Sequence, residues 1–309
     1  MANNPIIFSG TAHPQLAREV AKQLKLELGK VSFESFPDGE IGVQILENVR
    51  GRDVFVIQSP ALHPNRFLME LLILVDALKR ASAKSIVAVL PYYAYARQDR
   101  KDKGRVPITA RLVANLLERA GVTRLMTMDL HTEQIQGFFD IPVDHLYARP
   151  LFVEALKKLK LKEAVIVSPD IGSNKMARKF AEDLDLEIAI VDKRRINGRD
   201  VEANALIGSV KGKVAILVDD ISSTGETLKM AARVCQRAGA KEVYAVVVHA
   251  LLIGGHKLPG VDELFVTNSV PQKEKAKGLH VVSVAPLLAE AIESVMKAKS
   301  ISAMFKRKV

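Results

Sequence analysis

The sequence predicts an α/β protein with mainly parallel sheets that helices cover on both faces. Short, continuous runs of β-branched and other apolar residues recur along the whole chain, and longer stretches with helical spacing separate most of them. Hydrophobic residues make up 48% and charged residues 26% of the 309 residues, so the chain can bury a large core without disulfides or structural metal. At about 150 residues per domain, this length suggests two domains.

The expected strands are apolar for most of their length and end in polar or turn-forming residues. A strand that is buried on both faces shows this continuous pattern rather than strict alternation. In chain order they are PIIF (5–8), VFVIQS (54–59), SIVAVLP (85–91), RLMTMDL (124–130), EAVIVSPD (163–170), EIAIVD (187–192), KVAILVDD (213–220) and EVYAVVV (242–248).

The expected helices carry apolar residues three and four positions apart, which places these residues on one helix face. The most apolar stretch, 68–79, contains Glu70 and Asp76 and is too short to cross a membrane, so we expect a buried helix. Cys235 is the single cysteine and is expected to be a small core residue. In chain order the helices are AHPQLAREVAKQL (12–24), LMELLILVDALK (68–79), ITARLVANLLERA (108–120), KMARKFAEDL (175–184) and TLKMAARVCQRA (227–238).

The start of the chain, MANNPIIFSG, lacks the basic segment and long apolar segment of a signal peptide. We therefore expect a cytoplasmic protein with no membrane partner. Lys and Arg total 45 against 35 Asp and Glu, and the formal charge of +10 attracts polyanions. Because Trp is absent and the basic loops are poor in aromatic residues, a phosphorylated small molecule is favoured over nucleic acid.

Two stretches of the sequence echo one another. RASAKSIVAVLP begins at Arg80 and RAGAKEVYAVVV at Arg237, and in each a helix ends in small residues before Ala-Lys leads into a strand. A weaker third copy, from Arg119, is explained by the preference of helix ends for small residues. The first two favour duplication of one α/β unit, and we expect two similar domains, 1–148 and 149–309.

The stretch VDDISSTGETL (218–228) carries the clearest chemistry. It follows an apolar strand and precedes a helix, and ligands of open α/β sheets collect at such strand ends. Asp219 and Asp220 suit the hydroxyls of a sugar or a hard cation, whereas the Ser/Thr/Gly-rich turn and the helix N-terminus suit a phosphate. An N-cap alone would explain Ser223 or Thr224 but not the two carboxylates.

This stretch resembles the phosphoribosyl-binding loop of type I phosphoribosyltransferases. The sixteen residues DLHTEQIQGFFDIPVD, 129–144, narrow the resemblance to the ribose-phosphate diphosphokinase family. Other stretches similar to that family run in order along nearly the whole chain: FPDGE, ENVRG, MELLILVDALKRASA, YARQDR, VPITA, VSPDIG, DKRR and SISAMF. The resemblance implies two domains of type I phosphoribosyltransferase-like fold.

The resemblance also implies the reaction. Members of the family move the diphosphoryl group of ATP onto the 1-hydroxyl of ribose 5-phosphate, which gives 5-phosphoribosyl 1-pyrophosphate and AMP for nucleotide biosynthesis. ATP and ribose 5-phosphate are thus the expected substrates, and Mg²⁺ is the expected cofactor. By the resemblance, His131 and Asp170 are the Mg²⁺ ligands, each placed just after an expected strand.

The remaining site residues also follow from the resemblance. Lys193 and Arg195, in the polar segment 192–212, are the expected catalytic residues of a flexible loop that closes over the phosphates. The ATP-binding residues are expected in the stretch RQD and in the hairpin FPDGE, the latter reaching a neighbouring subunit. These residues are Arg97, Gln98 and Asp99, with Asp38, Gly39 and Glu40. The residues for ribose 5-phosphate are Asp219, Asp220, Ser223, Thr224, Gly225, Glu226, Thr227 and again Arg195.

The sugar-phosphate loop departs from the common bacterial pattern, which reads like VDDIIDTAGT. Here Ser222 replaces an apolar residue, Ser223 replaces Asp and Glu226 replaces Gly. A carboxylate that faced a bound phosphate would repel it, so we expect the Glu226 side chain to point to solvent. The replacement of Gly by Glu226 leaves open the affinity for ribose 5-phosphate and the regulatory class of the protein.

Three other functions remain open from the residues alone. A phosphoribosyltransferase would share the VDD loop but not the stretches DLHTEQIQGFF, YARQDR and FPDGE. A non-catalytic homologue would not need His131, Asp170, Lys193 and Arg195 together, and nucleic-acid binding rests only on the net charge. The resemblance further implies a homodimer that assembles into a homohexamer, with a region sensitive to phosphate or ADP near Asn48, Arg50 and Ser82.

Overall fold

The computed structural model describes residues 5–195, 202–272 and 276–305, and these divide into two compact units. Unit 1 comprises residues 5–147, 269–271 and 284–305, and unit 2 comprises the other described residues from 148 to 283. The segment 284–305 thus lies with unit 1, although it follows unit 2 in the sequence. The domain boundaries expected from the sequence, 1–148 and 149–309, stay a proposal.

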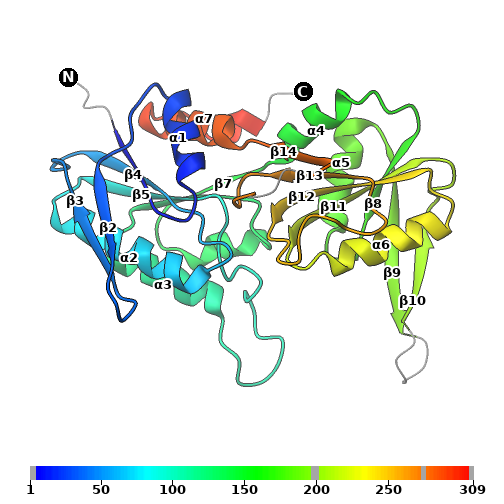
Figure 1. Ribbon diagram of the computed structural model, residues 1–309, viewed down its shortest axis with the longest axis horizontal. Helices are drawn as coiled ribbons and strands as arrows, with labels where there is room; N and C mark the ends of the chain where they lie inside the picture. The colour runs from blue at the N-terminus through cyan, green and yellow to red at the C-terminus, as the bar shows by residue number, and fades with distance from the viewer. Residues whose placement is uncertain (1–4, 196–201, 273–275, 306–309) are drawn as a thin grey trace. The chain divides into compact units, whose positions relative to one another are not determined.

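Unit 1 contains a five-stranded parallel sheet of order β1-β4-β5-β6-β7 and a separate antiparallel hairpin of β2 and β3 (Figure 1). Its elements are β1 (Ile6–Ser9), α1 (Pro14–Gln23), β2 (Val31–Ser35), β3 (Ile41–Ile45), β4 (Asp53–Ile57), α2 (Pro64–Arg80), β5 (Ser85–Leu90), α3 (Thr109–Ala120), β6 (Arg124–Met128), the 3₁₀ helix η1 (Glu133–Phe138), β7 (Val143–Leu146), α7 (Ala285–Met296) and the 3₁₀ helix η2 (Ser302–Phe305).

Helices cover both faces of this sheet. On one face α2 and α3 contribute Leu71, Leu74 and Val113 to a core that includes Ile86 and Ala88 of β5. On the other face lie α1 and α7, which pack against each other (Figure 1). The burial of sheet residues on both faces explains why these strands read as continuous apolar runs.

Unit 2 contains a seven-stranded sheet of order β10-β9-β8-β11-β12-β13-β14, in which only the β9–β10 pair is antiparallel. In this sheet β11 lies between β8 and β12. Its elements are α4 (Arg149–Lys157), β8 (Ala164–Ser168), α5 (Asn174–Leu184), β9 (Glu187–Arg195), β10 (Glu202–Ile207), β11 (Val214–Ser222), α6 (Glu226–Arg237), β12 (Glu242–Ala250), β13 (Glu263–Thr267) and β14 (Leu279–Val282).

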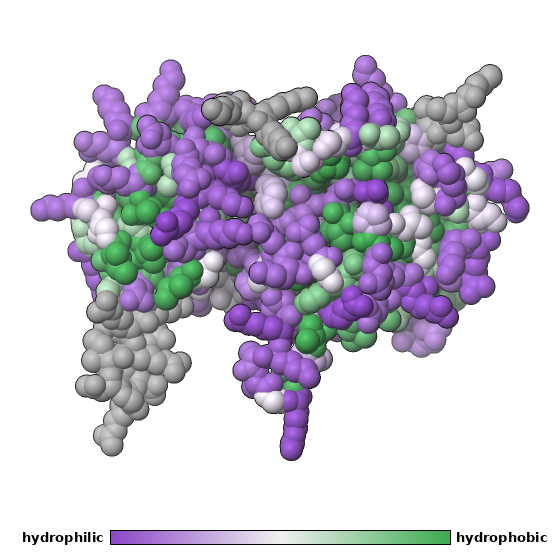
Figure 2. Space-filling model, turned by 180° about the vertical axis from the view of Figure 1, so that it is seen from behind, coloured by the Kyte–Doolittle hydropathy of each residue, from purple (hydrophilic) through white to green (hydrophobic). Residues whose placement is uncertain are grey.

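The core of unit 2 follows the same principle. The helix α6 packs Leu228, Ala231 and the buried Cys235 against Leu217 and Val247 of the sheet, and α4 and α5 cover the opposite face (Figure 1). Cys235 is therefore the core residue that the sequence predicts. The exterior is mostly hydrophilic on the face shown in Figure 2, where hydrophobic residues form separate patches.

The two units follow one plan. If β1 is matched with β8 and β4 with β11, the order β1-β4-β5-β6-β7 corresponds to β8-β11-β12-β13-β14. The two echoing stretches occupy matching places in this plan, as the turns from α2 to β5 and from α6 to β12. Both turns, like the end of α3, contain a residue with positive φ (Ser82, Gly121 and Gly239), and this feature ends the helices.

The structure confirms the predicted fold class and the buried helix at 68–79, which is part of α2. The segment 192–212 differs from the expected long loop, because β9 continues to Arg195 and β10 returns antiparallel to it from Glu202. The run of polar residues from 192 to 195 that ends β9 does not look like a buried strand of a parallel sheet. Within the described residues, no helix has both the length and the apolar character to cross a bilayer.

Candidate active site

The two adjacent aspartates lie at the carboxyl end of the central strand of unit 2. Asp219 pairs with Val247 of β12 and its side chain is almost fully buried, with 7% exposed, whereas Asp220 is half-buried. The backbone N–H of Asp220 donates to Oδ1 of Asp219 at 3.1 Å. These residues stand where ligands of open α/β sheets bind.

Asp170 is brought to the same place by the neighbouring strand β8. Its Oδ1 accepts a hydrogen bond from the backbone N–H of Ser173 at 3.0 Å, and the Ser173 hydroxyl lies 3.2 Å away. The same hydroxyl lies 2.8 Å from Oδ1 of Asp219. Ser173 therefore connects two predicted site residues that are far apart in the sequence.

The surroundings of Asp219 disfavour the charged form of its carboxyl group. Burial is the largest cause, and the negative charge of Asp220 adds to it, so that the pKa of Asp219 is raised to about 8. The hydrogen bond from Ser173 acts in the opposite direction, while the charge of Asp170 raises the pKa further. A group that supplies positive charge or hydrogen bonds here would relieve this repulsion.

The loop after β11 is held in a compact turn. Backbone N–H groups of Leu252 and Ile253 donate to the carbonyls of Ser222 and Ser223 at 3.2 and 2.9 Å. Gly225 has φ of +80°, and a Cβ there would lie 2.4 Å from Leu258, so both the backbone and the packing require glycine. The turn leads into the N-terminus of α6, where backbone N–H groups are available to an anion.

The prediction for Glu226 is confirmed. It is the first residue of α6, its side chain is 74% exposed, and its carboxylate pairs with Lys229 at 2.8 Å. This ion pair lowers the pKa of Glu226, which stays negative. Ser223 and Thr227 are half-buried and Thr224 is exposed, and the Thr224 hydroxyl accepts weakly from the Glu226 N–H at 3.5 Å.

The predicted ATP residues of the RQD stretch lie beyond the end of β5 in unit 1. Arg97 and Gln98 are exposed, and Gln98 Oε1 accepts from the Thr109 hydroxyl at the start of α3. Asp99 accepts a hydrogen bond from Thr132 at 2.7 Å. Since Thr132 follows His131, the structure brings the RQD stretch next to the predicted metal ligand of unit 1.

The hairpin residues Asp38, Gly39 and Glu40 form the exposed turn between β2 and β3. Asp38 accepts from the N–H of Glu40 at 3.1 Å, and Gly39 has φ of +94° with open space around it. Lys193 and Arg195 lie on β9, where their backbones pair with Asn204 and Glu202. Their side chains lie outside what the structure describes.

Two contact residues were missed by the sequence analysis. Ser173 stands three residues after Asp170 and immediately before α5, which is the spacing of a helix cap. Thr132 directly follows His131 and precedes η1. Both could have been found from these positions, but neither is distinctive in residue type.

The residues present fit a hard cation in part. The backbone N–H of Ser173 donates to Oδ1 of Asp170, and within the described residues no hydrogen bond reaches Oδ2, which can therefore serve a cation. His131 is exposed just beyond β6, and imidazole is a less usual Mg²⁺ ligand. No three His, Cys, Asp or Glu side chains in the described ranges form a metal cluster, but Mg²⁺ commonly takes most of its ligands from water and phosphate.

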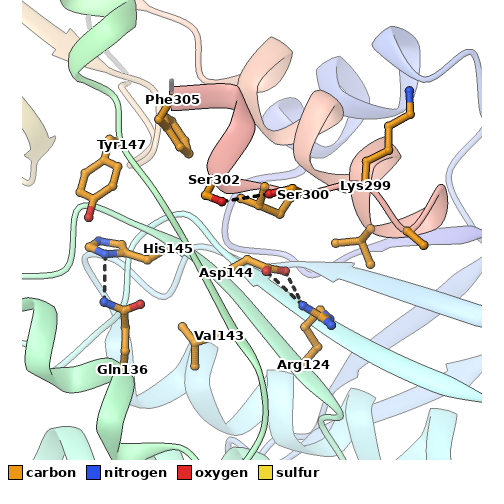
Figure 3. Close-up of a pocket in the computed structure, with 13 residues that line it drawn as sticks. Arg124, Gln136, Val143, Asp144, His145, Tyr147, Lys299, Ser300, Ser302 and Phe305 are labelled. Carbon is orange, nitrogen blue, oxygen red and sulfur yellow. Dashed lines mark hydrogen bonds and ion pairs between the residues drawn. The ribbon is translucent and has the colours of Figure 1, made fainter. Parts of the chain in front are cut away.

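Unit 1 also contains a pocket of about 660 Å³ between β6, β7, η1 and the segment after α7 (Figure 3). Its polar wall includes Arg124, which donates to both carboxylate oxygens of Asp144 at 3.0 Å. In its aromatic wall, Tyr147 contacts Phe305 edge-to-face and His145 with the rings tilted. His145 Nε2 accepts the N–H of Leu130 at 3.0 Å, so this wall supports the backbone just before His131.

Comparison with known proteins gives consistent similarities along the whole chain. Residues 5–121 match the N-terminal domain of ribose phosphate pyrophosphokinase, and residues 195–306 match the phosphoribosyl synthetase-associated domain. Ribose-phosphate pyrophosphokinase of Bacillus caldolyticus is 50% identical over 305 residues and that of Campylobacter jejuni 51% over 303, each with 97% of this chain covered and 97% and 98% of the relative. The crystal structure of phosphoribosylpyrophosphate synthetase from Mycobacterium smegmatis aligns with a TM-score of 0.90 and 44% identity, over 96% of this chain and 100% of that one.

Proposed function

This chain belongs to the ribose-phosphate pyrophosphokinase family, and from that premise we propose how its own residues share the work. The protein transfers the diphosphoryl group of ATP to the 1-hydroxyl of ribose 5-phosphate, and the products are 5-phosphoribosyl 1-pyrophosphate and AMP for nucleotide biosynthesis. The observation that carries this function is about 50% identity over nearly the full length of both chains.

The sugar phosphate binds at the carboxyl end of β11 in this proposal. Asp219 and Asp220 accept hydrogen bonds from the ribose hydroxyls, and residues Ser223–Thr227 receive the 5-phosphate. The two adjacent aspartates, the glycine-dependent turn and the start of α6 support this division, because carboxylates repel phosphate whereas backbone N–H groups attract it. Glu226 faces away, so it contributes its backbone rather than its side chain.

Mg²⁺ is the proposed cofactor, with Asp170 and His131 as its protein ligands. The oxygen of Asp170 that Ser173 does not engage supports the first assignment, and the resemblance of the DLH stretch supports the second. When bound, Mg²⁺ neutralises charge on the phosphates of ATP. Asp170 also fixes the start of α5, so its position does not depend on the cation.

ATP is proposed to contact Arg97, Gln98 and Asp99 in unit 1, and residues Asp38–Glu40 are proposed to reach the ATP of a neighbouring subunit. The bond between Asp99 and Thr132 supports the first group, because it ties the nucleotide loop to the segment of His131. Lys193 and Arg195 are proposed to neutralise the transferring phosphates, and Arg195 also to contact ribose 5-phosphate.

The reaction is tested by incubating the purified protein with Mg²⁺, ATP and ribose 5-phosphate and by identifying the nucleotide product. We expect AMP, because the sugar oxygen attacks the β-phosphorus and AMP leaves. ADP would indicate ordinary phosphoryl transfer, and absence of turnover would contradict the function. Replacing Asp170 by Asn should raise the Mg²⁺ concentration required for half-maximal rate.

We also propose a cytoplasmic location and a homodimer that assembles into a homohexamer. The family supports both, and the exposed hairpin turn at Asp38–Glu40 is where a neighbouring subunit would be needed. The mass in solution, measured with and without phosphate and Mg²⁺, tests the assembly. A monomer with full activity would contradict the proposed role of Asp38–Glu40.

A further inference from the structure

We propose that Ser173 is a positioning residue that holds Asp219 ready for ribose 5-phosphate. The inference rests on the proposed role of Asp219 as an acceptor for the sugar hydroxyls. Ser173 itself is not assigned any contact with a substrate. Its importance comes from where its two donors point.

Ser173 offers one donor to each of two acidic residues. Its backbone N–H lies 3.0 Å from Oδ1 of Asp170, and its hydroxyl lies 2.8 Å from Oδ1 of Asp219. The hydroxyl carries a single hydrogen, and the distance to Asp219 is shorter than the 3.2 Å to Asp170. We therefore assign the N–H to Asp170 and the hydroxyl to Asp219.

Asp219 needs such a donor because of its surroundings. Asp219 is 7% exposed, so water supplies few hydrogen bonds to its carboxyl group. Its neighbours Asp220 and Asp170 are acidic and do not offset its charge. The other hydrogen bond to Oδ1 comes from the N–H of the next residue, Asp220, which belongs to the same strand end. Among the described residues, Ser173 supplies the one hydroxyl that anchors Asp219 from another strand's loop.

The geometry separates the two effects of a substitution. Ser173→Ala removes the hydroxyl but keeps the backbone N–H that holds Asp170. The substitution should therefore weaken the binding of ribose 5-phosphate while Asp170, the proposed Mg²⁺ ligand, stays in place. Ser173→Thr keeps a hydroxyl on the same carbon and serves as the matched variant.

The test is a set of steady-state measurements on the full-length enzyme and its Ser173→Ala, Ser173→Thr and Asp219→Asn variants. We expect Ser173→Ala to raise KM for ribose 5-phosphate about tenfold, the size expected for the loss of one buried hydrogen bond. KM for ATP and the Mg²⁺ concentration for half-maximal rate should change less than about twofold, and Ser173→Thr should restore KM for ribose 5-phosphate. A purely structural role would shift all three constants together.

The outcomes test the role of Ser173 separately from the proposed role of Asp219, on which it rests. If Asp219→Asn raises KM for ribose 5-phosphate and Ser173→Ala leaves it unchanged, the role of Ser173 is wrong and that of Asp219 stands. If Asp219→Asn also leaves it unchanged, the proposed sugar site is wrong. Should Ser173→Ala fail to fold, Ser173→Cys keeps the volume with a weaker donor and must show the same selective rise. A Ser173→Thr enzyme as impaired as Ser173→Ala would overturn the proposal.

Discussion

The two units use the carboxyl end of corresponding strands in opposite ways. In unit 1, Gln58 follows β4, and its side-chain amide accepts from the N–H of Ala12 and donates to Glu70. The polar groups of Gln58 and Glu70 thus bond to each other and to the protein rather than to a ligand. In unit 2, Asp219 lies near the carboxyl end of β11, and the loop after β8 offers it the Ser173 hydroxyl. The same strand order thus supports a closed network in one unit and an acidic, ligand-ready end in the other.

The difference lies in how well each buried acid is satisfied. Glu70 is 1% exposed and accepts from the Thr11 N–H, the Thr11 hydroxyl and the Gln58 amide. Asp219 is buried beside two other carboxylates, and its pKa is raised to about 8. A satisfied buried acid stabilises its surroundings, whereas an under-satisfied one is costly in the free protein and is typical of a functional site.

The largest expected effect is on catalysis, at the carboxyl end of β11 in unit 2. Asp220→Asn should lower kcat/KM for ribose 5-phosphate about 100-fold, because a neutral amide accepts more weakly from the sugar hydroxyls than a carboxylate. Initial rates at limiting ribose 5-phosphate measure this. The exposed Asp185→Asn, at the end of α5, is the matched control and should leave the rates unchanged. A loss below about threefold would break the comparison.

A substitution in the Glu70 network, at the carboxyl end of β4 in unit 1, should instead affect stability. Glu70→Ala leaves the donors of Thr11 and Gln58 without their acceptor inside the protein, which should lower the free energy of unfolding by about 3 kcal/mol. Denaturant titration measures the change, and KM for ribose 5-phosphate should stay within about twofold. If Glu70→Ala costs less than about 1 kcal/mol, the network is not what closes unit 1.

The two turn glycines sharpen the contrast between the hairpin of unit 1 and the loop of unit 2. Gly39→Ala should cost only the strain of a positive φ, about 1–2 kcal/mol, because nothing lies near its Cβ. Gly225→Ala meets Leu258 at 2.4 Å as well, so it should cost more stability and also raise KM for ribose 5-phosphate. Thermal melts and initial rates compare the pair. Equal costs with no kinetic change would contradict the packing argument.

The raised pKa of Asp219 predicts a pH-dependent stability. The folded protein holds this proton up to about pH 8, whereas the unfolded chain releases it near the ordinary value of 3.8. Stability from this group is therefore present at low pH and is lost as pH rises through about 8. Asp219→Asn removes that loss, so its gain in Tm over the unmodified protein should be larger at pH 8.5 than at pH 6. A gain that is independent of pH would show that Asp219 titrates in its ordinary range.

The smallest effect is expected at Glu226, where the sequence departs from the common loop pattern. Its carboxylate is exposed where it pairs with Lys229, and water and salt screen such a pair strongly. Glu226→Gln should therefore change KM for ribose 5-phosphate less than about twofold and barely shift Tm. A strong fall in KM would mean that the side chain turns toward the phosphate when substrate binds.

Much of the fold could be predicted because buried parallel strands carry their signature locally. The runs at 54–59, 85–91 and 213–220 are apolar for most of their length, and the structure places β4, β5 and β11 there. The extension of β9 beyond residue 192 and the strand β10 were missed, since residues 192–195 are polar and β10 pairs antiparallel with β9 instead of lying in the parallel part of the sheet. The return of 284–305 to unit 1 depends on contacts distant in sequence, which no local pattern records.

The site was predicted unevenly for a similar reason. Asp219 and Asp220 stand out because a buried strand seldom ends in two carboxylates, and the structure does place Asp170 beside them through Ser173. Ser173 itself was missed, since a serine before a helix is first of all a cap. The orientation of Glu226 could be argued from charge alone, and it is confirmed.

The packing of α7 on α1 has a consequence for how the polypeptide matures. Buried residues of α7 such as Leu288 and Ile292 cover a face that belongs to the first-made part of the chain. During synthesis that face stays uncovered until α7 has left the ribosome. Completion of unit 1 is thereby tied to the synthesis of α7, and a chain that stops before residue 285 would present an open apolar surface to chaperones and proteases.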